Sequence, residues 1–387
     1  MRILWVHYID LNNDLYSTFP LLIIDSLRKR GHEIQLVVPS IGKNKTVAAG
    51  LKGDVVCLPT VRLPLLSILS FYFMSLLRLP GVIKKMPPLL VVVDIFSLPS
   101  ILIARLYANL KLVVDIRTSF IRETGGMRGY FNKIQYVFLC SLARSVSDRI
   151  TVTSTALKKE YCRMFRCDPA RVKVLTNGVS LDIFDYDKYA KDFKSLREQL
   201  NLNGKFVVFY HGSIGPERGL FETMEAISML APRYPDIIFF VMGTGFLLNE
   251  LKSFAEKKSL QNNVRFHGPV RHSEVPKYIS ISDVAIAAFD PFDYPRESCP
   301  LKILEYLAMM KPVITTDIPF NKELTRHGAC LYVINSDNAE SIEKAIEHVY
   351  KNACKFTQGA RIGRSVVEKY YTWDEKASDF ENFVGDF

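Results

Sequence analysis

The sequence predicts an α/β protein with two Rossmann-like, doubly wound domains that face a central cleft. Short runs of Val, Ile and Leu recur along the chain, and helical patterns alternate with them. The alternation stops once, around residues 182–203, and then starts again. Apolar strands without alternating polar residues are typical of a parallel sheet covered on both faces. A chain of 387 residues is long enough for two such domains.

The first domain is expected at residues 1–185. Helical patterns at residues 19–30 and 97–109 separate apolar runs, and Gly31-His32 is a stop signal after the first of these helices. This β-α-β alternation indicates a doubly wound sheet. Its strands are expected at residues 2–9, 33–38, 54–58, 89–95, 111–116, 149–153 and 172–175.

The second domain is expected at residues 204–360, after a polar linker at 186–203. Residues 361–387 have a helical pattern, and we hypothesise that they cross back to the first domain. Because ligands of such sheets bind beyond the carboxyl ends of the strands, we expect the site in the cleft. The strands are expected at 206–210, 237–242, 264–266, 284–288, 312–316 and 330–334, and the helices at 221–230, 247–257, 273–279, 301–310 and 339–351.

Composition excludes several classes of protein. Hydrophobic residues make up 48% and charged residues 23%, which is ordinary for a globular chain and not for a disordered or coiled-coil one. The seven cysteines are dispersed and form no CxxC pair, so neither a disulfide framework nor a zinc site is expected. Residues 1–6 do not have the pattern of a signal peptide, and we expect a cytoplasmic protein.

The net charge of +10 favours an anionic partner. Nucleic acid, anionic lipid and a phosphorylated small molecule are the candidates, and a soluble protein that is merely basic is the alternative. The sequence has no zinc-finger, RNP or arginine-rich motif, so we expect no nucleic-acid partner.

Two apolar segments suggest contact with a membrane surface. Residues 65–77 are uncharged, and basic residues follow them up to residue 85. Thirteen residues are fewer than the roughly 20 that span a bilayer, so the segment is either a helix on the sheet or one that dips into the surface. Residues 128–144 mix aromatic and basic side chains. We therefore predict peripheral binding to an anionic membrane through 65–85 and 128–144, on the inner face of the cell membrane.

A glycine-rich turn at residues 211–219 (HGSIGPERG) follows an expected strand. Such a turn lets backbone N–H groups approach an anion, and Arg218 adds a fork that suits a diphosphate. A tight turn with a solvated arginine is the alternative. The turn at 243–245 lacks the third glycine of a dinucleotide fingerprint, because Leu248 stands there. Nicotinamide and flavin cofactors are therefore not expected.

The motif with the most specific signal is 297–305 (ESCPLKILE). Pro300 suits the first turn of a helix, whose free N–H groups would point at an anion. Glu305 lies inside that helix, where a carboxylate can accept two hydrogen bonds from a sugar diol, and Glu297 lies in the loop before it. The alternative is a surface Glu297 and an ordinary helical Glu305. The N–H groups concerned are those of Cys299, Leu301 and Lys302.

Together these motifs resemble the GT-B glycosyltransferases of the glycosyl-group-1 type, family 4. Glu297 and Glu305 match the Glu-x7-Glu element of that family, and residues 297–313 (ESCPLKILEYLAMMKPV) are close to its pattern. Residues 149–184 resemble the end of the family's first domain, and 266–270 (FHGPV) resemble its F-x-G-x-V element. The resemblance covers nearly the whole chain.

The resemblance implies a retaining hexosyl- or N-acetylhexosaminyltransferase that uses a nucleoside-diphosphate sugar and no metal or other cofactor. It implies a glycan or lipid-linked acceptor, in polysaccharide or glycolipid biosynthesis. By position, Glu297 would lie near the donor sugar's hydroxyls, Glu305 would bind the ribose, and Arg218 would neutralise the diphosphate. The main chain at Val270 would contact the base. The residues expected to bind the donor are Gly212, Ser213, Arg218, Val270, Glu297, Cys299, Pro300, Leu301, Lys302 and Glu305.

The sequence departs from the family at three places, one of which is the first βα loop at residues 10–14, where the family's usual glycines are missing. Ser213 follows Gly212 where the family commonly has Gly-Arg, so one diphosphate cation is missing. Arg117 stands where the first domain of the family often has a histidine, and the expected catalytic set is Glu297, Arg218 and Arg117. A sugar-nucleotide epimerase or hydrolase on the same scaffold stays open, as does a non-catalytic sugar-nucleotide-binding or membrane scaffold protein. Incubation with a donor and no acceptor tests the first alternative, and nucleotide binding without turnover across a broad acceptor panel would favour the second.

Overall fold

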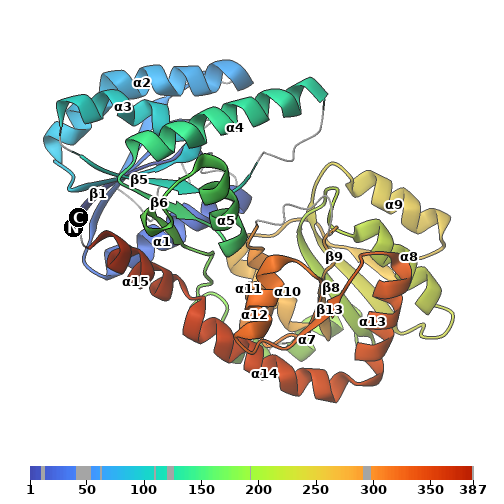
Figure 1. The fold of residues 1–387 in the computed structure, drawn as a ribbon. Helices are drawn as coiled ribbons and strands as arrows, with labels where there is room; N and C mark the ends of the chain where they lie inside the picture. The colour runs from blue at the N-terminus through green and yellow to red at the C-terminus, as the bar shows by residue number, and fades with distance from the viewer. Residues whose placement is uncertain are drawn as a thin grey trace. The chain divides into compact units, whose positions relative to one another are not determined.

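The computed structural model describes residues 1–9, 14–40, 54–61, 63–108, 110–119, 126–191, 193–290 and 298–385. The chain divides into two compact units, each built on a parallel sheet (Figure 1). The first comprises Met1–Asn177, Glu297–Cys299 and Trp373–Phe387, and the second comprises Gly178–Arg296 and Pro300–Thr372. The predicted class, two Rossmann-like α/β domains, is confirmed.

In the first unit, the described strands are all parallel and lie in the order β3-β2-β1-β4-β5-β6-β7. Ile3 of β1 is opposite Ile34 on one side and Leu90 on the other. The direction of winding reverses between β1 and β4, so the switch point of this sheet lies at their carboxyl ends. The strands are β1 (Arg2–Val6), β2 (Glu33–Ser40), β3 (Val55–Pro59), β4 (Leu90–Asp94), β5 (Lys111–Ile116), β6 (Arg149–Val152) and β7 (Val172–Val174).

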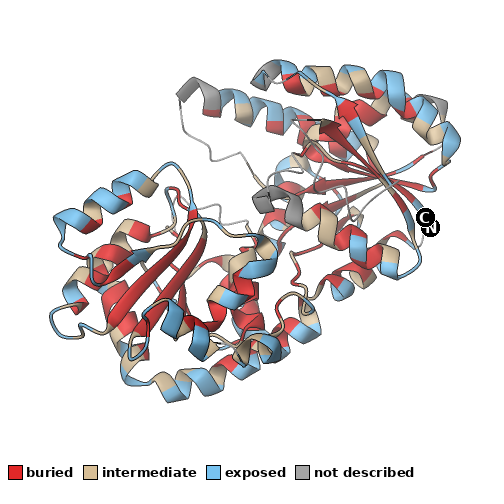
Figure 2. Ribbon diagram, turned by 180° about the vertical axis from the view of Figure 1, so that it is seen from behind, coloured by how far each residue is buried: buried red, intermediate tan, exposed pale blue. Residues whose placement is uncertain are grey.

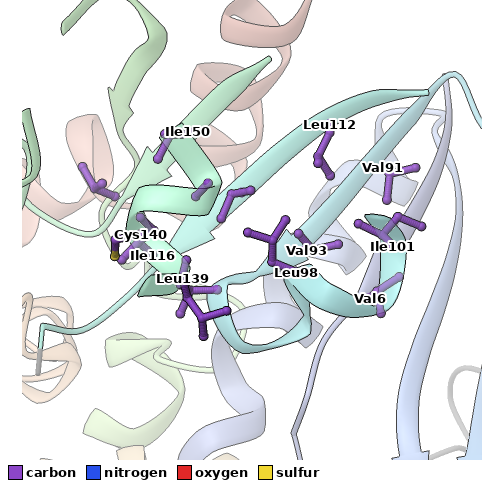
Figure 3. Packing of buried hydrophobic residues seen from close by; sticks show 14 of the residues in the cluster. Val6, Val91, Val93, Leu98, Ile101, Leu112, Ile116, Leu139, Cys140 and Ile150 are labelled. Carbon is purple, nitrogen blue, oxygen red and sulfur yellow. The ribbon is translucent and has the colours of Figure 1, made fainter. Parts of the chain in front are cut away.

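Helices cover both faces of this sheet. On one face Phe71, Leu98 and Leu139 pack in a single core with Val6 and Val91 (Figure 3). On the other face, residues of α1 and α15 form a second core with Ile3 and Trp5. The helices are α1 (Asp14–Lys29), α2 (Pro64–Lys85), η2 (Ile95–Ser97), α3 (Leu98–Tyr107), α4 (Gly126–Val146), α5 (Thr155–Phe165), η3 (Pro169–Arg171) and α15 (Trp373–Val384).

Helix α2 is longer than the apolar segment at 65–77 suggests. It continues past Arg78 and through Pro80 to Lys85, a length of 22 residues. By length and composition Leu66–Lys85 could cross a membrane. In the structure, 22% of its apolar stretch is buried inside the protein. The argument from a length of thirteen residues was therefore wrong, because a basic residue and a proline do not end this helix.

The described strands of the second unit are also parallel, in the order β10-β9-β8-β11-β12-β13. Their switch point lies between β8 and β11. Apolar residues such as Val208, Ile227 and Ile286 form its core. The strands are β8 (Phe206–Ser213), β9 (Ile237–Thr244), β10 (Val264–Phe266), β11 (Val284–Ala287), β12 (Val313–Thr316) and β13 (Leu331–Ile334).

The second unit also takes in segments that the sequence assigns elsewhere. The expected linker at 186–203 contains two short helices of this unit, and the helix that precedes residue 371 belongs to it as well. Of residues 361–387, which we hypothesised to cross back to the first domain, only Trp373–Phe387 belong to the first unit. The helices are α6 (Tyr186–Ala190), α7 (Phe193–Gln199), α8 (Leu220–Leu230), α9 (Leu248–Lys257), η4 (His272–Glu274), α10 (Val275–Ser280), α11 (Leu301–Ala308), α12 (Pro319–Arg326), α13 (Ala339–Lys351) and α14 (Ala353–Tyr370).

Candidate functional site

The site is built at the switch point of the second sheet, where β8 ends in a glycine-rich edge. Strand β8 pairs with β9 as far as Ser213 opposite Thr244, three residues beyond Tyr210, where the sequence predicts the strand to end. A Cβ on Gly243, which has φ +146°, would lie 1.9 Å from the carbonyl oxygen of Gly212. The turn at 243–245, interpreted from the sequence as a simple connection, therefore presses its backbone against the predicted diphosphate turn, and no larger residue fits there.

A buried carboxylate lies beside this edge, held by two histidines. Glu305 is on α11, and its Oε2 lies 2.8 Å from Nε2 of His211, while its Oε1 lies 2.7 Å from Nε2 of His272. Glu305 is 2% exposed, whereas the His272 side chain is 25% exposed and faces solvent in part. The Tyr306 hydroxyl lies 3.1 Å from both the backbone nitrogen and Nδ1 of His211. The hydroxyl accepts from the backbone N–H and donates to Nδ1, so His211 carries its proton on Nε2 and donates it to Glu305.

These contacts set the charges of the site. Burial raises the pKa of Glu305, but the hydrogen bonds from His211 and His272 outweigh it and lower that pKa to about 2. Burial lowers the pKa of His211, against the pull of Glu305. At neutral pH, Glu305 is therefore an ionised carboxylate and His211 is neutral.

Two cations flank the aromatic ring of Phe289, which follows β11. The guanidinium of Arg218 lies 5.8 Å and the ammonium of Lys302 5.9 Å from the ring centroid. Lys302 also lies 3.9 Å above the ring of Tyr210, and a Cβ on Gly212 would come within 3.2 Å of its Nζ. Burial, and then the charge of Arg218, hold the pKa of Lys302 well below its usual range. An anion bound beside Arg218 and Lys302 would favour the charged form of Lys302.

The structure thus brings four of the predicted residues together: Gly212, Arg218, Lys302 and Glu305. Ser213 is exposed at the end of β8, and Val270 is half-buried in the segment that joins β10 to η4. Pro300 is the residue before α11, whose helical residues begin at Leu301.

Two further predicted residues have other surroundings. Cys299 belongs to the first unit, where its carbonyl accepts a hydrogen bond of 2.6 Å from Nδ2 of Asn177. Glu297 lies outside the described residues.

Arg117, predicted as a catalytic group, is tied to its own unit. Its Nε donates to Asp115 at 2.7 Å, its Nη1 donates to the carbonyl of Leu175 at 2.7 Å, and its guanidinium lies 3.2 Å from the ring centroid of Phe19. Asp115 also accepts from the Thr151 hydroxyl at 2.6 Å. These contacts give Arg117 a packing role at the end of β5, and its Nη2 is buried without a hydrogen-bond partner among the residues that the structure describes.

Three residues of the network were not predicted as site residues. His211 stood inside the glycine-rich motif, where only the glycines and Arg218 carried the argument. Tyr306 lies in the helix expected at 301–310, and no role was predicted for it. Nothing local in the sequence marks His272, because it meets Glu305 only through the packing of η4 beside α11, 33 residues further along the chain.

The first sheet carries a second histidine–carboxylate pair at its own switch point. His7 follows β1 and its Nδ1 lies 3.3 Å from Oδ1 of Asp94, the last residue of β4. Asp94 also accepts from the backbone N–H groups of Tyr8 at 2.8 Å and Phe96 at 2.9 Å. Burial opposes its ionisation, but the charge of His7 and these hydrogen bonds lower its pKa. No local pattern marks this pair in the sequence, since its members are 87 positions apart.

The carboxylate network predicts how stability depends on pH. The unfolded chain protonates His211 near pH 6.5 and Glu305 near 4.5, whereas the folded chain resists both protonations. Stability should therefore fall as the pH drops below about 6.5, and fall again between about 4.5 and 2. Thermal unfolding of the wild type and of His211→Gln, which keeps a donor but does not titrate, checks this. Equal slopes for the two proteins between pH 7 and 5 would remove His211 from the account.

Within the described parts of the chain, no three His, Cys, Asp or Glu side chains are grouped as ligands for a metal ion. The site that the structure assembles is thus one of glycine backbone, two cations and a histidine-held carboxylate.

Comparison with known proteins places this arrangement in a family. Residues 192–364 match the family described as Glycosyl transferases group 1, and residues 18–183 match Glycosyltransferase Family 4. Alpha-D-kanosaminyltransferase of Streptomyces kanamyceticus is 26% identical over 192 residues, which are 50% of this chain and 48% of that protein. The UDP-Gal:alpha-D-GlcNAc-diphosphoundecaprenol alpha-1,3-galactosyltransferase of Escherichia coli is 25% identical over 222 residues, 56% of this chain and 55% of that one.

The chain spans about half the length of the first curated relatives that it matches, 45% of one from Bacillus subtilis and 48% of the kanosaminyltransferase. Among solved structures, Anabaena Alr3699/HepE in complex with UDP-glucose has a TM-score of 0.78 and 16% identity, with both chains covered fully. The two family matches fall on the two units that carry the sheets, and the fold resembles that of the Anabaena structure. The chain belongs to the glycosyltransferases of group 1, family 4, and its fold is GT-B.

Proposed function

We propose that this glycosyltransferase moves a hexosyl or N-acetylhexosaminyl group from a nucleoside-diphosphate sugar to a glycan or lipid-linked acceptor, with retention of configuration. The observation that carries the donor half is the pair Arg218 and Lys302, which flank Phe289 at the glycine-rich edge. Such a pair suits one diphosphate better than two separate ions. The Anabaena structure contains UDP-glucose, and the name of the Escherichia coli relative contains a UDP-sugar and a diphosphoundecaprenol acceptor, which supports the proposal.

The chemistry follows from charge development. As the nucleoside diphosphate leaves, negative charge grows on its β-phosphate while the sugar becomes oxocarbenium-like. Arg218 and Lys302, with the N–H groups that open α11, would stabilise that charge without reorganisation. Bound diphosphate would also favour the ammonium form of Lys302, whose pKa is low in its absence. Attack by the acceptor hydroxyl from the face that the phosphate leaves would retain the configuration.

Glu305 would bind the ribose of the donor. Each of its oxygens already accepts one histidine hydrogen bond, and each keeps a second lone pair for a ribose hydroxyl. His272, partly exposed, is the group that the ribose would meet first. We assign Glu297 to the hydroxyls of the donor sugar and the main chain at Val270 to the base, both by their position in the family's motifs.

The acceptor would bind at the edge of the first sheet, beside His7 and Asp94. A histidine held by a buried carboxylate can position and deprotonate a hydroxyl. We expect His7→Gln to lower turnover about 100-fold at saturating donor, with donor Kd unchanged. His32→Gln is the matched control, because the half-buried His32 also pairs with a carboxylate of the same unit, that of Glu381. A donor Kd that changes as much as turnover would show that His7 serves the fold instead.

The function is tested by incubating the protein with UDP-, GDP- and ADP-sugars, with and without glycan and lipid-linked acceptors. A thermal-shift screen first selects the donor, because a bound ligand raises apparent stability. The proposal expects transfer with retention, unchanged by a chelator since no metal is required. Epimerised donor or free sugar as the main product would favour an epimerase or hydrolase. Nucleotide binding without turnover on any acceptor would favour a non-catalytic protein. We also propose that the reaction takes place in the cytoplasm, in polysaccharide or glycolipid biosynthesis.

A further inference from the structure

Helix α2 exposes large apolar side chains on the side where a helix that covers the sheet of a soluble domain exposes polar ones. The side chains that face the core are Ser67, Phe71, Ser75 and Leu79, each at most 7% exposed, and two of them are serines. The side chains that face outward are larger and apolar. A helix that only closes a soluble core has the opposite pattern. The exposed set is Leu66, Leu69, Phe73, Leu76 and Leu77, at 38–60%.

Helix α4, on the same face of the sheet, also exposes large apolar side chains on its outer side. Its inward residues, such as Tyr136 and Leu139, pack in the core that also contains Phe71 and Leu79 of α2. Its outward residues, at helical spacing, are large and apolar, and Figure 2 shows exposed residues along both helices. The exposed set is Tyr130, Phe131, Ile134, Val137 and Phe138, at 37–65%. We call these two exposed sets the apolar face.

Both helices are entirely free of acidic residues. Helix α2 has 22 residues and α4 has 21, and their sequences contain neither Asp nor Glu. Each helix contains three basic residues. Five of these six have described side chains, and all five are exposed: Arg78, Lys84, Lys85, Lys133 and Arg144. Large apolar side chains with only positive charge around them are typical of a surface that binds anionic lipid.

We propose that the apolar face docks on an anionic lipid bilayer, with α2 and α4 lying in the plane of the headgroups. Helix α2 does not have to leave the domain to do so. Phe71 and Leu79 are fixed in the core, and the Tyr72 hydroxyl donates to the carbonyl of Phe96 at 2.7 Å. The inner side of the helix therefore stays on the sheet while the outer side enters the lipid.

Charge decides between the bilayer and the other occupants of such a face. A second copy of this chain in a two-fold contact would set the same basic helices against each other, which like charges oppose. A protein partner would need an acidic rim with an apolar centre. A bilayer that contains anionic lipid supplies both the apolar interior and the negative surface.

The experiment is sedimentation of the full chain with vesicles of phosphatidylcholine, with or without phosphatidylglycerol. We expect binding to the anionic vesicles, loss of it in high salt, and about ten-fold weaker binding for Lys84→Gln with Lys85→Gln. The triple variant Leu69→Gln, Phe73→Gln, Leu77→Gln should bind at least ~100-fold more weakly, because its apolar contribution is removed. Phe246→Gln is the matched control, since Phe246 is 75% exposed but lies in the second unit.

These variants replace exposed side chains, so they should fold, and an unchanged melting temperature verifies it. Equal vesicle binding by the triple variant and by Phe246→Gln would overturn the proposal, as would no binding to anionic vesicles. Sedimentation to native membranes but not to protein-free vesicles would identify a protein partner instead. A wild-type dimer that the triple variant turns into a monomer would identify a second copy. The readout needs no donor or acceptor, so it is independent of the proposed reaction.

Discussion

Arg218→Ala lowers the turnover of sugar transfer by at least ~100-fold, with a smaller effect on the affinity for the intact donor. The guanidinium is placed with Lys302 beside Phe289, where the negative charge of the departing diphosphate would grow. A cation aimed at charge that develops only in the transition state acts mainly on kcat. Steady-state kinetics on the selected donor and acceptor measure the effect.

The control for this variant is Arg233→Ala. Arg233 also lies beside an aromatic ring, 5.5 Å from the ring centroid of Tyr234, and it pairs with Glu343 and Glu347. It precedes β9, however, and so lies at the amino ends of the strands, opposite the site. Its loss should leave turnover unchanged. If Arg218→Ala were as active as Arg233→Ala, the arginine would have no part in the mechanism.

Glu305→Ala weakens donor binding by at least ~10-fold and also destabilises the second unit. The carboxylate is buried, and its removal leaves His211 and His272 without their acceptor. Breaking such a buried pair costs about 3–5 kcal/mol. Calorimetric titration with the nucleoside diphosphate gives the first effect, and thermal unfolding in its absence gives the second.

Glu343→Ala separates the two effects. Glu343 is a buried carboxylate of the same unit, 7% exposed and paired with Arg233, far along the chain from the site motifs. It should lower stability but leave donor affinity as it is. A donor Kd that is the same for Glu305→Ala and for the wild type would make Glu305 a structural residue.

The regular elements could be predicted from the sequence because each is bounded by local signals. Strands β5 and β10 and helix α13 have the predicted bounds, and the Asn338 side chain caps α13 by accepting from the N–H of Ser341. Strand β8 was predicted to end at Tyr210, with the glycine-rich turn at 211–219 directly after it. It continues to Ser213 because β9 pairs with it residue by residue, which is tertiary information.

The sequence predicts those residues of the candidate site that lie together in one motif. Lys302 and Glu305 are three positions apart on one helix, so their common location follows from the sequence. That Glu305 is held by His211 and His272 does not, because the contacts join three separate elements. The same distinction holds for Arg117. Its ion pair with Asp115 could have been anticipated, because the two residues are only two positions apart. Its hydrogen bond to the carbonyl of Leu175 could not, because that contact joins the ends of two separate strands.

The central claim is that Arg218, Lys302 and Glu305 together hold a nucleoside diphosphate at the edge of the second sheet. Calorimetric titration of the wild type and of Lys302→Met with UDP, GDP and ADP tests it most directly. We predict that at least one nucleotide binds the wild type and that Lys302→Met weakens its binding at least ~10-fold, since a charge-assisted contact is lost. Absence of binding for all three nucleotides, or equal binding by both proteins, would contradict the claim.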